Sequence, residues 1–136
     1  MKVQTALSSA LLLGLAGMAA AASQPAADSK TQGERLYRVY CASCHGSSGH
    51  GDGPVAEALK VRPTDLTRLR EHGAFPADRI AAAIDGRQPV RGHGTGGMPV
   101  WGLSFQDRGR DSDQERQARE QIRDLVAYLE SIQTKK

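Results

Sequence analysis

Apolar residues near the C-terminus recur at helical spacing. Between Ile122 and Ile132 they fall three or four positions apart, which gathers them on one face of a helix. Upstream, Ser112 is followed three residues later by Glu115, the pattern of a capping box at a helix start. These positions predict an amphipathic helix over about 112–132.

A second helical pattern lies in the first third of the chain. Leu36 and Tyr40 stand four positions apart, and Ser29 provides an N-cap in front of Lys30. Gly46 ends the pattern, because glycine is the residue most favoured just after a helix. The sequence therefore predicts one continuous helix from about Lys30 as far as Gly46.

A third helix is predicted between Pro76 and Gly86, with Ile80, Ala83 and Ile84 facing inward. Pro54 suits the first position of a further short helix. No segment alternates with a period of two, so we expect no substantial sheet. The fold class predicted is all-α, with three to five helices.

Three segments between these helices are expected to be loops. Residues 46–53 and 91–102 are rich in glycine, and residues 60–75 combine proline, glycine and charged side chains. The segment 91–102 cannot form a stable helix by itself. We expect a flexible backbone there that another part of the molecule must hold.

The N-terminus has the features of a secretory signal peptide over residues 1–22. A positive charge precedes an apolar run over 10–20, which is too short to span a bilayer comfortably, and small residues follow. Residues 23–29 are small and polar and are expected to form a flexible linker. The folded domain is expected to cover 30–134, in an exported, periplasmic protein.

Composition excludes some classes of function. The formal net charge is +3 over 136 residues, and the basic residues are scattered, which is unlike a nucleic-acid-binding surface. The chain contains three Tyr, two Phe and one Trp, a small supply for a hydrophobic core. A bulky apolar cofactor would make up this deficit. The sequence of the charged stretch 106–120 does not indicate a function for it.

The two cysteines, Cys41 and Cys44, are separated by two residues and followed directly by His45. A disulfide between them would close a very small loop and stabilise the fold little. A redox-active pair is typical of a strand–helix unit, whereas the segment before Cys41 is predicted to be helical.

A zinc site would normally need a second close pair of Cys or His ligands. The remaining histidines stand singly in predicted loops: His50, His72 and His93.

Cys-x-x-Cys-His is the attachment pattern for c-type haem. Residues three and four apart share a helix face, so Cys41, Cys44 and His45 point the same way. The two thiols can then bond to the two vinyl groups of one porphyrin, and the imidazole can reach the iron as an axial ligand. The sequence therefore predicts one covalently bound haem c.

Met98 is the candidate for the second axial position. Glycines precede it and Pro99 follows it, which lets the backbone approach the ring closely and stiffens the turn. His/Met ligation raises the reduction potential. His93 lies five residues earlier in the same loop and is the alternative ligand. Ordinary core packing is the other role that a methionine here would have.

These motifs resemble a class I cytochrome c of the small bacterial monohaem kind. The likeness runs from about Gly33 to Ile132 and rests on "CASCHG", "GDGP", "PTDLT", "GGMPVWG" and "LVAYLESI". The resemblance implies the cytochrome c fold, with helices wrapped around one haem. It also implies that the first and last helices cross, with Gly33 and Tyr37 facing Tyr128.

The resemblance further implies roles for residues around the cofactor. A loop proline carbonyl, with Pro54 preferred over Pro63, would accept a hydrogen bond from the axial imidazole. Trp101 and Arg91 would bond the haem propionates, or otherwise serve in packing and solvation.

The expected function is one-electron transfer rather than catalysis. Donors and acceptors would be membrane respiratory complexes or an exported dehydrogenase, docking transiently at the haem edge. If Met98 does not bind the iron, an open position would suit a gas sensor or a weak peroxidase. A haem subunit permanently docked in a dehydrogenase is the other alternative.

Overall fold

The computed structural model describes residues 25–70, 73–87, 97–106 and 112–134. Every element in these ranges is a helix, which confirms the all-α prediction, and none of these helices is long and apolar enough to cross a membrane. The elements are α1 (Pro25–Tyr40), α2 (Ala42–His45), η1 (Ala56–Ala58), η2 (Leu66–Arg68), α3 (Ala77–Asp85), α4 (Trp101–Ser104) and α5 (Ser112–Ser131).

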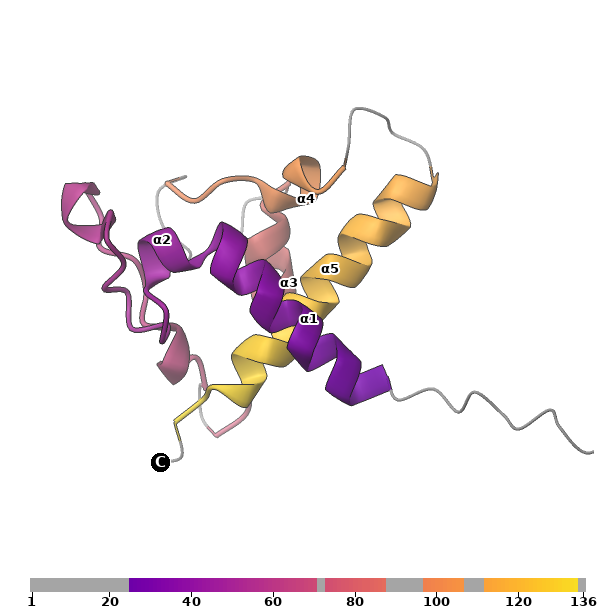
Figure 1. Ribbon diagram of the computed structural model, residues 1–136, viewed down its shortest axis with the longest axis horizontal. Coiled ribbons are helices and arrows are strands. Elements are labelled where there is room, and N and C mark those ends of the chain that lie inside the picture. The colour runs from indigo at the N-terminus through magenta and orange to yellow at the C-terminus, as the bar shows by residue number, and fades with distance from the viewer. Residues whose placement is uncertain (1–24, 71–72, 88–96, 107–111, 135–136) are drawn as a thin grey trace, which may run out of the picture.

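The two long helices, α1 and α5, cross near the centre of the molecule (Figure 1). Gly33 lies at the crossing, where a Cβ atom would collide with the main-chain carbonyl of Asp124 and lie 2.9 Å from the Cβ of Tyr128. The rings of Tyr37 and Tyr128 meet beside it, with their centroids 5.1 Å apart. The predicted contact of Gly33 and Tyr37 with Tyr128 is therefore confirmed.

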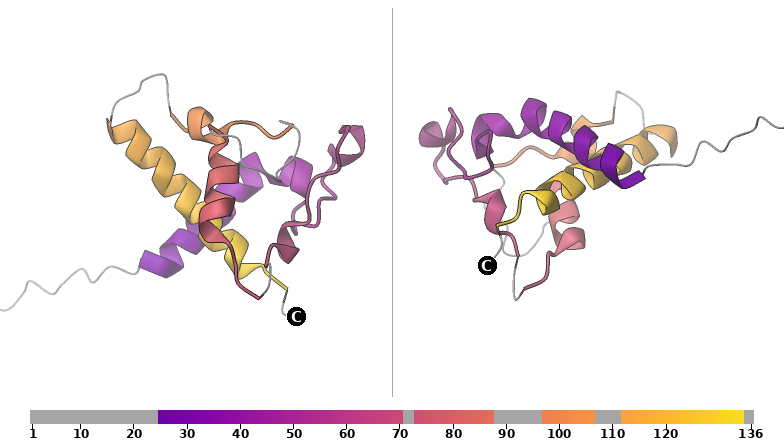
Figure 2. Two further views of the ribbon diagram at one scale, coloured as in Figure 1. Left: turned by 180° about the vertical axis from the view of Figure 1, so that it is seen from behind. Right: turned by 60° about the horizontal axis from the view of Figure 1, so that its bottom comes forward.

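Helix α3 packs against α5 (Figure 2). The apolar faces of α1, α3 and α5 meet in a single core, which α4 adjoins. Its buried members are Leu36, Tyr37, Ile80, Ile84, Ile122, Leu125, Tyr128 and Leu129. Ile80, Ile84 and the inward positions predicted for α5 contribute to this core or pack against it, whereas Ala83, also predicted inward, is only half-buried and lies outside it.

Helix α1 begins earlier than predicted. The expected start near Lys30, after Ser29, is wrong, because the helix starts at Pro25 and includes most of the expected 23–29 linker. A proline at the first helical position loses no hydrogen bond, and Asp28 in the first turn favours the positive end of the helix dipole. The extra residues therefore extend α1 without a penalty.

The helix expected to run without interruption into the cysteine motif is divided at Cys41. That residue has φ −118° and ψ −35°, away from regular helical values, and it separates α1 from α2. Its amide still donates to the Tyr37 carbonyl at 2.9 Å, and its carbonyl accepts from the His45 amide at 2.9 Å. Gly46 ends α2 as predicted, with φ 81°.

Two further local predictions need correction. The helix expected after Pro54 is only the single 3₁₀ turn η1, and α4 begins at Trp101, within the last two residues of the loop expected over 91–102. The Val100 carbonyl starts α4 by accepting the amides of Leu103 and Ser104, at 3.1 and 3.2 Å. The signal peptide, Arg91 and His93 lie outside the described residues.

The first half of α5 contains the described part of the charged stretch. Its side chains pair along the exposed surface of the helix at three- and four-residue spacing. The pairs are Arg116–Asp113 at 2.9 Å, Arg119–Glu115 at 3.4 Å and Arg123–Glu120 at 3.7 Å. Each is solvent-exposed and contributes a few tenths of a kcal/mol, about 0.3–0.5. These charges therefore form the solvated face of the helix.

Candidate haem-attachment site

Helix α2 carries the Cys41–His45 motif and is tied to the core by one buried hydrogen bond. The Tyr37 hydroxyl donates to the Gly46 carbonyl at 2.6 Å. Tyr37 is fully buried between α1 and α5, and burial raises its pKa well above the ordinary tyrosine value. Its hydroxyl therefore remains a donor over the whole physiological pH range and fixes the end of α2.

The glycine-rich loop that follows satisfies the last carbonyls of α2. Three alternate amides of this loop each donate to one carbonyl of the helix. The bonds are Gly51 to His45 at 2.8 Å, Gly53 to Cys44 at 3.1 Å and Val55 to Ser43 at 3.1 Å. Gly53 has to be glycine here, because a Cβ atom would lie 2.7 Å from the Ala42 carbonyl oxygen.

The imidazole of His45 is oriented by a main-chain carbonyl. Its Nδ1 atom lies 3.0 Å from the carbonyl oxygen of Thr64. Because a carbonyl can only accept, this bond requires the tautomer with the proton on Nδ1, which leaves a lone pair on Nε2. Burial lowers the pKa of His45, and the bond to Thr64 opposes part of that shift. The neutral, ligating form is therefore favoured at neutral pH.

Pro54 does not provide the carbonyl that orients His45, so that prediction is wrong. Pro54 is exposed and lies just before η1. The acceptor, Thr64, follows Pro63, whose own carbonyl lies against Gly51. Every residue has a backbone carbonyl, so residue type does not indicate which one accepts a long-range hydrogen bond. The sequence therefore could not distinguish Thr64 from its neighbours.

The two thiols are free and half-buried. Burial, with a smaller contribution from the Cys44 thiol, raises the pKa of Cys41 to about 11. A nucleophilic redox cysteine normally has a lowered pKa, because its thiolate is the reactive form. The surroundings of Cys41 therefore disfavour thioredoxin-type disulfide exchange.

No group of three or more His, Cys, Asp and Glu side chains in the described ranges is arranged to hold a metal ion. Within those ranges, the ligand sets typical of structural zinc are not assembled.

Residues 97–100, which include Met98, run from the start of α4 toward α2 in all three views (Figures 1 and 2). Met98 is 40% exposed and is therefore not a residue of the packed core, which was its alternative role. The chain fold thus brings the segment that carries the thioether to the same end of the molecule as the cysteine motif.

Large apolar side chains remain uncovered on the segments that flank this end. They are Val55, Leu59, Val61, Met98 and Val100, each between 37% and 56% exposed. With two free thiols and an imidazole whose Nε2 keeps its lone pair, these surfaces fit a planar apolar group with two thiol-reactive substituents and a metal. The residues present therefore fit haem c.

Trp101 lies in an aromatic cluster with Tyr40 and Phe105. The ring centroids are 5.4 Å apart for Tyr40 and Trp101, 5.2 Å for Tyr40 and Phe105, and 5.6 Å for Trp101 and Phe105. The cluster fastens α4 to the end of α1, directly before Cys41. Packing is thus a demonstrated role of Trp101, and its bond to a propionate stays a prediction, as does that of Arg91.

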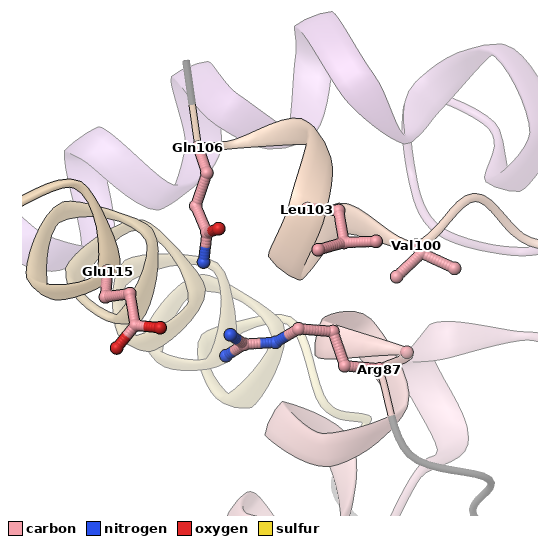
Figure 3. A pocket seen from close by; sticks show the side chains of 6 residues that line it. Arg87, Val100, Leu103, Gln106 and Glu115 are labelled. Carbon is pink, nitrogen blue, oxygen red and sulfur yellow. The ribbon is translucent and has the colours of Figure 1, made fainter. Parts of the chain in front are cut away.

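A shallow hollow of about 420 Å³ lies elsewhere, where the end of α3 meets α4 and the start of α5 (Figure 3). Arg87 points across it toward Gln106 and Glu115 while its guanidinium pairs with Asp85 at 2.6 Å. Val100 and Leu103 form its apolar side. No residue of the cysteine motif lines this hollow, and Val100 is the one side chain that it shares with the uncovered apolar surface described above.

Comparison with known proteins agrees with this site. The family described as "Cytochrome C oxidase, cbb3-type, subunit III" matches residues 28–129. No curated protein matches at a significant level. A solved structure with a similar fold is the reducing HAO-like protein complex of Kuenenia stuttgartiensis, at a TM-score of 0.55 and 22% identity. The match covers 82% of this chain and 47% of that one, so this chain spans about half its length.

Proposed function

Because the chain belongs to the family of cytochrome c oxidase cbb3-type subunit III, a family of c-type cytochrome domains, we propose that it is a one-electron carrier with a single covalently attached haem. The observation that carries the proposal is the geometry of one turn. Cys41, Cys44 and His45 lie within five residues, and the imidazole is already fixed by Thr64 in the tautomer that a metal ligand needs.

Each residue of the turn has a separate task. The thiols of Cys41 and Cys44 would hold the porphyrin by thioether bonds, and Nε2 of His45 would ligate the iron. The carbonyl of Thr64 keeps the ring from rotating and makes the imidazole a better donor. The hydrogen bonds from the loop amides around Gly53 to the carbonyls of α2 hold the turn in place. Little of the protein would then have to rearrange when the iron gains or loses an electron.

Met98 would supply the second axial ligand. Bound haem supplies the Fe(III)/Fe(II) couple, and a thioether opposite a histidine favours the ferrous state. The exposure of Met98 and the course of residues 97–100 support this assignment. His93 stays the competing ligand, and an open iron position, suited to gas sensing or weak peroxidase activity, is the outcome if neither binds.

We further propose that the protein works in the periplasm after removal of residues 1–22. Its partners would be redox proteins, either a membrane respiratory complex or an exported dehydrogenase. Docking would be transient and confined to a small surface around the exposed haem edge, which suits the small interfaces of electron-transfer complexes.

Permanent docking as a haem subunit is the second arrangement. It is favoured by the family description, which names an oxidase subunit, and by the solved structure of similar fold, which is described as a complex. Size-exclusion chromatography of the protein purified from its native membrane and soluble fractions separates the two. A free carrier elutes alone, whereas a subunit elutes with its partners.

The full chain expressed in a bacterium that matures c-type cytochromes tests the proposal. The purified protein should be red, should contain one haem per chain that organic solvent does not extract, and should show a reversible one-electron potential. In the ferric state it should show a sulfur-to-iron charge-transfer band and no high-spin bands. High-spin bands in the ferric spectrum would contradict the proposed electron carrier and favour the alternative with an open iron position.

A further inference from the structure

The end of α5 is bonded to the loop that orients His45. The Gln133 side chain donates to the Leu66 carbonyl at 2.7 Å and accepts from the Leu69 amide at 2.8 Å. It also donates to the Leu129 carbonyl of α5, the helix that ends just before it, at 2.7 Å. One partly buried amide therefore fastens both sides of η2 to α5, across 64 to 67 residues of sequence.

The neighbouring residue strengthens the same connection. Thr134 donates twice to the carbonyl of the buried Thr67, from its amide at 2.9 Å and from its hydroxyl at 3.1 Å. Thr67 is in turn bonded to Asp65 through its amide and hydroxyl, at 2.9 and 2.6 Å. The loop from Thr64 to Leu69 thus has almost no freedom to shift along α5.

This loop is also bonded to the segment that follows the cysteine motif. The Leu66 amide donates to the Gly49 carbonyl at 2.6 Å, and a Cβ atom on Gly49 would lie 3.1 Å from Cδ1 of Ile132. The Thr64 carbonyl that accepts the hydrogen bond from His45 Nδ1 stands two residues before Leu66. The position of that carbonyl therefore depends on the bonds made at the end of α5.

We propose that Gln133 is a positioning residue for His45. It acts through residues 64–69, by fixing the carbonyl to which the imidazole donates. The inference rests on the proposed function in taking His45 as the iron ligand. The bonds at the C-terminal end of α5 would therefore influence the strength of the hydrogen bond from His45 Nδ1 to Thr64. A stronger hydrogen bond makes His45 a better electron donor to the iron.

Gln133→Met tests the proposal, because it keeps the length of the side chain and removes its polar atoms. Ser131→Ala is the matched control. It removes a hydrogen bond at the same end of α5, at 2.7 Å to the Tyr128 carbonyl, which does not reach the loop. Gln133→Glu is a second variant, since it keeps an acceptor for Leu69 and loses the donor to Leu66 and Leu129. All are made in the full, haem-loaded chain.

Three quantities are measured: amide exchange at Leu69 and Leu66, the His45 Nδ1 proton resonance, and the reduction potential. In Gln133→Met we expect exchange at Leu69 to quicken about fivefold or more, as for the loss of one hydrogen bond. The His45 resonance should move and the potential should rise, because a weaker Nδ1–H bond makes the imidazole a poorer donor to ferric iron. In Gln133→Glu, which keeps the acceptor for the Leu69 amide, exchange at Leu69 should quicken less than in Gln133→Met.

Unchanged His45 resonance and potential in Gln133→Met, with faster exchange at Leu69, would overturn the inference and leave Gln133 as a purely structural residue. Unchanged exchange would overturn it as well. A potential that rises equally in Ser131→Ala would show that any loosening of α5 suffices, which also contradicts it. Failure of the proposed function is read separately, from a wild-type chain that carries no covalent haem.

Discussion

The hydroxyl of Tyr37 lies 2.6 Å from the carbonyl oxygen of Gly46, joining the buried crossing of α1 and α5 to the end of the cysteine-bearing turn. Tyr37 is fully buried, so the bond has no competition from water. The helix crossing, which gives the fold its stability, is thereby connected directly to α2, which carries the chemistry.

Removing this bond should destabilise the fold measurably. Tyr37→Phe keeps the ring contact with Tyr128 and leaves the Gly46 carbonyl without its partner, for an expected loss of about 1–3 kcal/mol in the free energy of unfolding. Denaturant unfolding of the haem-loaded protein measures it. Tyr40→Phe, at a partly exposed position, is the control and should change the stability little. Equal effects of the two substitutions would show that the buried bond is unimportant.

The helix crossing depends on the absence of a side chain at position 33. Gly33→Ala places a methyl group against the Asp124 carbonyl and forces the helices apart, so we expect a loss of about 1–3 kcal/mol despite the higher helix propensity of alanine. Gln32→Ala, on the exposed side of the same helix, should stay within about 0.5 kcal/mol of the wild type. A stabilised Gly33→Ala protein would mean that the helices do not pack this closely.

Much of this architecture is visible in the sequence, because local signals and one strong motif coincide. Gly86 and the apolar positions of α3 predict that helix, and the resemblance to class I cytochromes c implies the crossing at which Gly33 and Tyr37 meet Tyr128. Ser29 gives the wrong start for α1, because a serine that would suit an N-cap is still tolerated inside a helix when the preceding residues, from Pro25, can also be helical.

The contacts that the sequence does not predict are long-range and involve the backbone. Thr64 acts through its carbonyl, which every residue possesses, and it meets His45 only after the intervening loop has folded. Gln133 follows the last turn of α5, where a polar residue normally indicates only solvent exposure. Such partners are set by the tertiary path of the chain rather than by residue type.

Acid should weaken the loop that orients His45. The hydrogen bond from the Thr67 hydroxyl is the main cause that lowers the pKa of Asp65, and the amide of Thr67 and the nearby His50 add to it. A lowered carboxyl pKa contributes stability that is present above the ordinary value and lost as the pH falls through the folded-state value.

We therefore expect the free energy of unfolding to fall less steeply with acid in Asp65→Asn than in the wild type. Thr67→Val, which removes the hydroxyl donor, should flatten the same part of the pH profile. Denaturant unfolding at a series of pH values from neutral downward measures this. Wild-type slopes in both variants would rule out Asp65 as a source of the acid sensitivity.

Met98→Ala should remove the sulfur-to-iron charge-transfer band completely and lower the reduction potential, because the iron loses its thioether. His93→Ala is the comparison and should leave both the band and the potential in place. Optical spectra and a redox titration of the two variants decide the assignment. If Met98→Ala keeps a wild-type spectrum while His93→Ala alters it, the second ligand is His93.

The covalent bond between this chain and one porphyrin is tested most directly by the intact mass of the protein after expression with the c-type maturation machinery. We predict one added haem on the wild type and none that survives denaturation on the double variant Cys41→Ala/Cys44→Ala. A wild-type mass equal to that of the bare polypeptide, with no visible absorption, would contradict the account.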